Sequence, residues 1–260
     1  GMGSFMLPVS MGEKYKAIVS TTEGIKKEFS LPEPEANRLA LSITERNGVI
    51  HYTILHTPQK KLSENLYLVA HIRGFLLFIQ PIEKEQGAIN LQSVPEGILT
   101  LTILDGNYLP HSERLAFVRR ENNSVWKLTP DKSSYDSRSP VSLDIHLSDL
   151  SGQPIKGNFS LSVTDNYAIG CDSIGDNILS NLLLTSDLKG YIHQPGYYFV
   201  SPSPRKQTEL DILLMVHGWR KYDMSQAIST APFTPLQLPE AQLVLNGQVK
   251  STILKNKLKD

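Results

Sequence analysis

Hydrophobic and polar residues alternate along most of the first half of the chain, which is the pattern of half-buried β-strands. Leu39, Leu41 and Ile43 fall on one face of such a segment, with smaller or polar residues between them. About nine short strands are predicted in this half. They cover residues 15–19, 28–31, 39–44, 49–55, 66–72, 75–82, 89–94, 98–104 and 114–118. Their short and regular spacing favours an antiparallel β-sandwich over a parallel α/β sheet.

Turn chemistry marks where these strands reverse. Asn47-Gly48 is the strongest hairpin signal in the chain, because both central residues of a type I′ turn need a positive φ. Arg73-Gly74 is predicted to close a second hairpin, and Glu23-Gly24 is predicted to join the first two strands. Pro32 ends the second strand, because proline has no N–H to donate to a ladder.

The second half begins with the same strand pattern and then changes character. Residues 125–165 read as strand, polar turn, strand, Gly-Pro turn and strand. An apolar stripe with a period near 3.6 predicts a helix over residues 176–189, started by Ser173-x-x-Asp176 and stopped by Gly190. A second helix is predicted from Thr208-x-x-Asp211 towards Tyr222, after a loop at residues 202–204.

These patterns predict two tandem β-sandwich domains, residues 5–121 and 122–228, the second with two short helical insertions. Residues 229–260 are predicted to be a Pro-spaced linker and the first strand, Gln242–Leu245, of a following β-domain. Trp126 and Tyr135 are predicted to lie in the core of the second domain.

Composition narrows the choice of partners. The 260 residues are 40% hydrophobic, which is enough for a sizeable core. Because 26 Lys and Arg residues balance 26 Asp and Glu residues, no basic field is available to attract nucleic acid or an anionic membrane. The single cysteine excludes an intrachain disulfide. No run approaches the ~18 apolar residues of a membrane span. We expect the chain to be a piece of a longer protein, so the absence of a signal peptide carries no weight.

Residues 125–165 resemble the macroglobulin domains of the alpha-macroglobulin superfamily. Residues from about 15 to 250 resemble large envelope proteins of Gram-negative bacteria. The matching segments are residues 91–98, 113–118, 161–165, 177–184, 186–190, 197–199 and 213–222. The resemblance implies macroglobulin-like sandwiches of the immunoglobulin or fibronectin type, followed by a carboxypeptidase-regulatory-like domain. Some such proteins continue into a plug like that of TonB-dependent outer-membrane receptors.

The resemblance also implies an extracytoplasmic location, in the periplasm or at the outer membrane and cell surface of a Gram-negative bacterium. One departure from the superfamily is informative. Its thioester-bearing members carry a Gly-Cys-Gly-Glu-Gln motif, whereas Cys171 here follows Gly170 and precedes Asp172, Ser173 and Ile174, with no glutamine. The covalent trap is therefore not predicted for this chain.

Metal chemistry has little support in the sequence. His51 and His56 are five residues apart on one predicted strand, so their side chains face opposite sides and do not chelate one ion. An oxygen-rich stretch contains Asp165, Asn166, Asp172, Asp176 and Asn177. Its spacing fits no EF-hand loop, and these residue types also form turns and cap helices. No metal site and no cofactor are predicted.

Catalytic motifs are equally sparse. The chain has neither a Gly-x-Ser-x-Gly elbow nor a phosphate-cradling glycine loop. Cys171 lies just before a predicted helix, which would favour a reactive thiolate, but a lone cysteine is more often a small packed hydrophobe. We predict that the chain is not an enzyme and assign no catalytic residue.

The aromatic residues near the second predicted helix are the candidate interaction surface. It consists of Tyr197, Tyr198, Trp219 and Arg220. Neighbouring residues of a strand point to opposite faces, so at least one ring of residues 197–199 is expected to be exposed. The alternative, which aromatic burial favours, is that these rings pack in the sandwich.

The expected function is that of a non-catalytic structural or interaction module of a larger cell-envelope protein, linked to TonB-dependent outer-membrane transport. Its expected partners are other domains of the same polypeptide or other envelope proteins. The alternative is a glycan- or peptide-binding module that uses exposed aromatics. Exposure of Tyr198 and Trp219 in one shared groove would separate the two functions.

Overall fold

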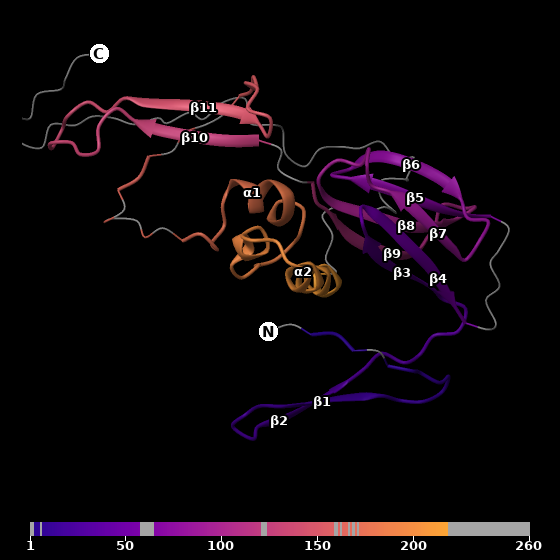
Figure 1. Ribbon diagram of the computed structural model, residues 1–260. Coiled ribbons are helices and arrows are strands. Elements are labelled where there is room, and N and C mark those ends of the chain that lie inside the picture. The colour runs from indigo at the N-terminus through magenta and orange to yellow at the C-terminus, as the bar shows by residue number, and fades with distance from the viewer. Residues whose placement is uncertain are drawn as a thin grey trace, which may run out of the picture. The chain divides into compact units, whose positions relative to one another are not determined.

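Antiparallel strands dominate the first half of the protein, as the alternation of its residues predicts (Figure 1). The computed structural model describes residues 3–217 except 6, 58–64, 121–123, 159–160, 162, 166, 168–169 and 171. The strands of the first half are β1 (Lys16–Ser20), β2 (Lys26–Ser30), β3 (Leu39–Arg46), β4 (Val49–His56), β5 (Leu66–Ile72), β6 (Phe75–Pro81), β7 (Gln86–Asn90), β8 (Gly97–Asp105) and β9 (Pro110–Val118). The strand predicted at residues 89–94 is shifted, because β7 ends at Asn90 and the chain turns between Leu91 and Val94.

Two of the sheets share one hydrophobic core in a β-sandwich-like arrangement. One sheet has the order β3-β4-β7 and the other has the order β6-β5-β8-β9. The predicted face of β3 is confirmed, because Leu39 and Leu41 are buried in this core and Ile43 packs against it. Each fully buried aliphatic side chain contributes about 1.5–3 kcal/mol, so this core is the main source of stability for the first half.

The tight turns of the sandwich have the backbone geometry that the sequence predicts. Asn47 and Gly48 have φ angles of 51° and 74°, and Arg73 and Gly74 have φ angles of 49° and 80°. A positive φ at both central residues matches the twist of the flanking strands. The Arg73-Gly74 turn joins β5 to β6, and it fixes the position from which the Arg73 side chain extends.

The second half contains a separate two-stranded sheet of β10 (Ser124–Pro130) and β11 (Leu143–Asp149). After the turn at Gly152, Pro154 forms an isolated bridge with Ser148. The predicted third strand does not continue through the described residues of the 155–165 segment. The structure therefore confirms a mainly β protein with antiparallel sheets, while the macroglobulin-like form of both predicted domains stays a prediction.

Helical elements follow, as predicted, but they begin at other residues. They are α1 (Ile178–Ser180), the π-helix η1 (Asn181–Thr185), the 3₁₀-helix η2 (Pro195–Tyr198) and α2 (Pro204–Val216). The predicted start at Ser173-x-x-Asp176 is wrong, because the cap of α1 is Asn177. Its side-chain oxygen accepts hydrogen bonds from the Leu179 and Ser180 N–H groups at 3.0 and 3.1 Å. The Ser180 hydroxyl accepts from the Asn177 N–H at 2.9 Å and completes a capping box.

Two further predictions about this region are corrected. Helix α2 begins at Pro204, because Ser203 caps it and proline suits the first helical position, so Thr208 lies inside the helix and not at its start. Residues Tyr197 and Tyr198 belong to the 3₁₀-helix η2 and not to a strand. The left-handed Gln194 (φ 47°) precedes Pro195, and this pair turns the chain into η2.

The linker and strand predicted at residues 229–260 lie outside the described residues, and the domain boundaries at 121/122 and 228/229 stay predictions. Within the described part of the chain, no helix is long and apolar enough to cross a membrane.

Candidate interaction surface

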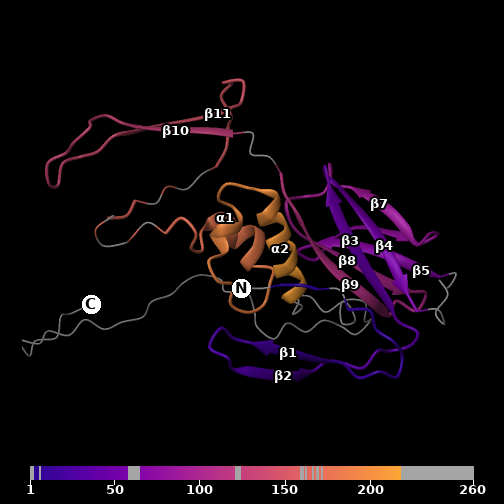
Figure 2. The same cartoon turned by 60° about the horizontal axis from the view of Figure 1, so that its bottom comes forward.

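A helical layer, residues 176–217, packs on the outer face of β8 and β9 (Figures 1 and 2). The shared apolar cluster consists of Ile98, Leu115, Leu184, Leu188, Ile192, Tyr198, Leu210, Leu213 and Leu214. Strand β8 is consequently buried on both faces along almost its whole length, since its other face lines the sandwich core. The layer therefore belongs to the same packed body as the sandwich of the first half.

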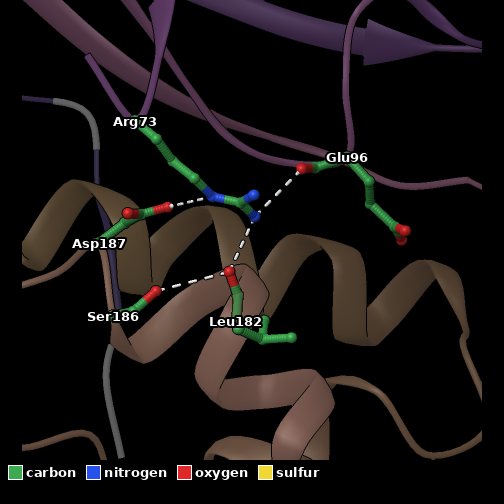
Figure 3. Close-up of polar contacts among 5 residues, drawn as sticks. All are labelled: Arg73, Glu96, Leu182, Ser186 and Asp187. Atoms are coloured by element: carbon green, nitrogen blue, oxygen red, sulfur yellow. Dashed lines mark hydrogen bonds and ion pairs between the residues drawn. The ribbon is translucent and has the colours of Figure 1, made fainter. Parts of the chain in front are cut away.

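Arg73 joins the β5–β6 turn to the helical layer (Figure 3). Its Nη2 donates to the Leu182 carbonyl at 2.8 Å and to the Glu96 carbonyl at 3.4 Å. Its Nε lies 3.4 Å from Oδ2 of Asp187, whose side chain is only 9% exposed. A guanidinium offers several N–H groups in a fixed plane, so one side chain bonds both a strand connection and the helical layer.

A second arginine ties β9 to α2. Nη2 of Arg114 donates to both carboxylate oxygens of Asp211, at 2.7 and 2.8 Å. Its Nη1 donates to the Leu115 carbonyl at 2.8 Å. The Arg114 side chain is 12% exposed and that of Asp211 is 44% exposed, so water screens only one side of this pair.

A third arginine is held by aromatic rings. The Arg119 guanidinium lies 5.6 Å from the ring centre of Phe117 and 5.5 Å from that of Phe199. It also donates to the Tyr198 carbonyl at 2.7 Å. Burial lowers the pKa of Arg119, and the negative charge of Glu96 opposes this shift. These contacts fix the C-terminal end of β9 against η2.

The structure corrects the aromatic surface that the sequence predicts. Tyr198 is only 6% exposed, because its ring packs into the apolar cluster of the helical layer, so it is not a surface residue. Tyr197 is half-buried, and its hydroxyl donates to Oε2 of Glu209 at 2.6 Å. This bond raises the pKa of Tyr197 and lowers the pKa of Glu209. Trp219 and Arg220 lie outside the described residues, and the burial of Tyr198 removes one member of the expected groove.

An exposed apolar surface lies instead on the β10–β11 hairpin. One face of this sheet carries three apolar cross-strand pairs. They are Trp126 with Leu147, Leu128 with Ile145, and Pro130 with Leu143. Residues between them, such as Thr129 opposite Asp144, are polar and point to the other face. We call Trp126, Leu128, Leu143, Ile145 and Leu147 the hairpin face.

The hairpin face is partly open to solvent, most of all on β10, whereas Ile145 and Leu147 of β11 are half-buried. Trp126 is 47% exposed and Leu128 is 49% exposed. The prediction that Trp126 is a core residue is therefore wrong for this chain. The alternation of apolar and polar residues identifies this face correctly, but alternation does not say whether another layer covers it.

The connection between β10 and β11 is ordered by Tyr135. Its hydroxyl donates to Oδ1 of Asp131 at 2.5 Å and accepts from the Lys132 N–H at 3.0 Å. Oδ1 of Asp131 also accepts from the Ser142 N–H at 3.0 Å. The Tyr135 bond lowers the pKa of Asp131 and raises that of Tyr135. Tyr135 thus organises this connection through its hydroxyl.

The oxygen-rich stretch serves local structure, as one of the two readings of the sequence predicts. Oδ1 of Asp172 accepts from the Ile174 and Gly175 N–H groups, and Oδ1 of Asp176 accepts from the Ser180 hydroxyl at 2.6 Å. Asn166 and Cys171 lie outside the described residues. Among the residues that the structure places, no three His, Cys, Asp or Glu side chains come together as metal ligands.

His51 and His56 lie on the same strand, β4, as predicted. His56 bonds Glu85 through Nε2 at 2.8 Å. The pKa of His56 is raised, first by its bond to the Thr57 carbonyl and then by Glu85. This pair connects β4 to the segment just before β7.

No protein-family model, no curated protein and no solved structure matches the chain. The resemblance to macroglobulin-like envelope proteins therefore stays a prediction from the sequence.

Proposed function

We propose that the chain is a non-catalytic structural and interaction module of a larger extracytoplasmic cell-envelope protein. The observation that carries this proposal is the hairpin face, an apolar sheet surface on a hairpin whose opposite face is mostly polar. A contiguous apolar surface rimmed by polar residues is typical of a contact with another protein layer. The module works by binding such a layer.

The fold supports a second part of this role, which is spacing. The sandwich and the helical layer are joined by a shared apolar cluster and by the contacts of Arg73, Arg114 and Arg119. Such cross-links resist relative movement of the two parts, because each movement would leave buried polar groups unsatisfied. A rigid body that carries an apolar contact surface is suited to hold neighbouring domains at a fixed distance.

The macroglobulin-like identity of the β units belongs to the same proposal. The antiparallel hairpins of the first half and the β10–β11 hairpin support it. The proposed partners are other domains of the same polypeptide or other envelope proteins, in the setting of TonB-dependent outer-membrane transport. Their contacting surface would be an apolar sheet or helix face that packs on the hairpin face.

The experiment is to raise an antibody against this chain and probe fractions of its native cells. We expect the antigen in the envelope fraction, on a polypeptide much larger than the 29.0 kDa of the chain. Periplasmic contents, outer membranes and cytosol would be separated and checked with marker enzymes. A cytosolic antigen, or one of 29.0 kDa, would contradict the proposal.

A further inference from the structure

Strand β6 is an edge strand with an unusual composition. It ends the sheet order β6-β5-β8-β9, so no described strand pairs with its outer side. Its seven residues include no charged side chain, and Phe75, Leu76 and Ile79 are 76%, 58% and 52% exposed. Soluble proteins usually protect an edge with lysine, proline or a covering segment, because an open ladder of N–H and C=O groups recruits another strand. Within β6, Pro81 at its far end and the extra residue at the register shift with β5 have this effect.

The pairing of β6 with β5 shows which side chains share a face. Ile79 lies opposite Val69, and Leu76 lies opposite His71. Val69 and His71 are two residues apart on one strand, so they point to the same face. The register shift between Ala70 and His71 leaves one extra residue in β6, and this brings Leu76 and Ile79 to the same face although they are three residues apart.

We propose that β6 pairs edge to edge and antiparallel with the β6 strand of a second copy of this chain. The two-fold axis would pass between Leu77 and Phe78 and stand perpendicular to the sheet. Leu76 then lies opposite Ile79 of the partner subunit, and Ile79 lies opposite Leu76 of the partner subunit. The exposed apolar residues are therefore matched by the symmetry, which makes the edge self-complementary.

Charge does not oppose this occupant. Like charges placed directly opposite each other destabilise a strand pair, and self-pairing of β6 creates none because the strand has no charged residue. The symmetry axis also keeps the same face of both sheets on one side, so the two Leu–Ile contacts form a continuous apolar strip on the extended sheet.

The expected association is weak. A strand of seven residues is roughly 24 Å long at about 3.4 Å per residue. A single strand pair of this length covers less than the ~800 Å² per partner of a stable complex, so the dimer should depend on concentration. This inference is independent of the proposed envelope function, because β6 contributes nothing to the hairpin face.

The test is sedimentation equilibrium of the full chain at roughly 10 to 500 μM. We expect the weight-average mass to rise from 29.0 kDa towards twice that value. Ile79→Lys should weaken dimerisation about tenfold or more, because lysine on an edge strand opposes strand addition. The matched control is Leu55→Lys, since Leu55 is 49% exposed but lies on β4, which is flanked by β3 and β7.

Leu76→Lys provides a second edge variant, and thermal unfolding of each variant identifies those that are folded. A wild-type chain that stays monomeric over the whole range would overturn the proposal and leave the edge to another polypeptide. Equal dimerisation of the wild type and both folded edge variants would also overturn it. So would equal weakening by Ile79→Lys and Leu55→Lys, or assembly beyond the dimer.

Discussion

Arg73, Arg114 and Arg119 join the helical layer to the sandwich through three different kinds of contact. Arg73 bonds a main-chain carbonyl 109 residues away, and Arg114 bonds a carboxylate 97 residues away. Arg119 bonds a carbonyl 79 residues away and lies against two aromatic rings. No local pattern predicts such partners, because each depends on how distant segments pack. The sequence therefore identifies the arginines as ordinary charged residues, and the structure gives them their role.

Arg73→Ala should lower the free energy of unfolding by about 1–2 kcal/mol, since it removes two bonds to carbonyls and one partner of the buried Asp187 carboxylate. This loss of stability is smaller than for a fully buried network, because the Arg73 side chain is 38% exposed and water screens its interactions. Urea unfolding followed by circular dichroism measures this change.

Arg38→Ala is the matched control for that substitution. Arg38 pairs with Glu35 three residues away, and both side chains are mostly exposed, so its removal should cost less than about 0.5 kcal/mol. Equal losses in the two variants would show that Arg73 does not hold the helical layer.

His71, on β5, is expected to make the stability of the protein depend on pH. Burial lowers its pKa below the ordinary value of 6.5, so the folded protein favours the neutral ring. Above pH 6.5 the ring is neutral in both the folded and the unfolded chain, and the protein has its full stability. As the pH falls below 6.5 towards the folded pKa, the unfolded chain binds a proton more readily than the folded chain, so stability is lost. Wild type should therefore lose more stability than His71→Gln between pH 7.5 and pH 5.5, values chosen on either side of the ordinary histidine pKa at about 6.5. Identical pH profiles of the unfolding midpoint in the two proteins would contradict this reading.

At the scale of single elements, hairpins are predicted more accurately than helix ends. The Asn47-Gly48 and Arg73-Gly74 turns follow from the conformational demands of two adjacent residues, so the sequence is sufficient. Several residues near position 176 are able to cap a helix, and tertiary packing selects among them. Asn177 is the cap of α1. Ser203 followed by Pro204 is itself a local start signal for α2, which the prediction at Thr208 missed.

Asn177→Ala should destabilise the protein by about 1 kcal/mol, because two N–H groups at the start of α1 lose their acceptor. Thermal or urea unfolding measures the loss. Asn181→Ala is the control, since Asn181 lies after the cap and its amide makes only a 3.4 Å contact with Thr185. A control variant that loses as much stability as Asn177→Ala would remove the capping role.

At the scale of the whole molecule, the sequence predicts the amphipathic helices but not the surface that they cover. An apolar stripe shows that a helix needs a partner, yet it does not specify which sheet provides it. Leu184 and Leu213 pack with Ile98 and Leu115 of the first-half sheet, although the sequence places the helices in a second domain. The same limit applies to Trp126. The alternation of apolar and polar residues around it predicts a buried position, but no layer of the described residues covers this face of the β10–β11 hairpin.

We propose that the hairpin face binds another protein layer within a longer envelope protein. The most direct measurement is amide hydrogen exchange of residues 124–149, compared between this chain and the full-length native polypeptide. We expect slower exchange in the native polypeptide, and we expect Leu128→Asp on the hairpin face to remove this protection. Lys127→Asp, on the opposite face of the same strand and paired with His146, should leave it unchanged. Equal exchange in the isolated chain and in the native polypeptide would contradict the account.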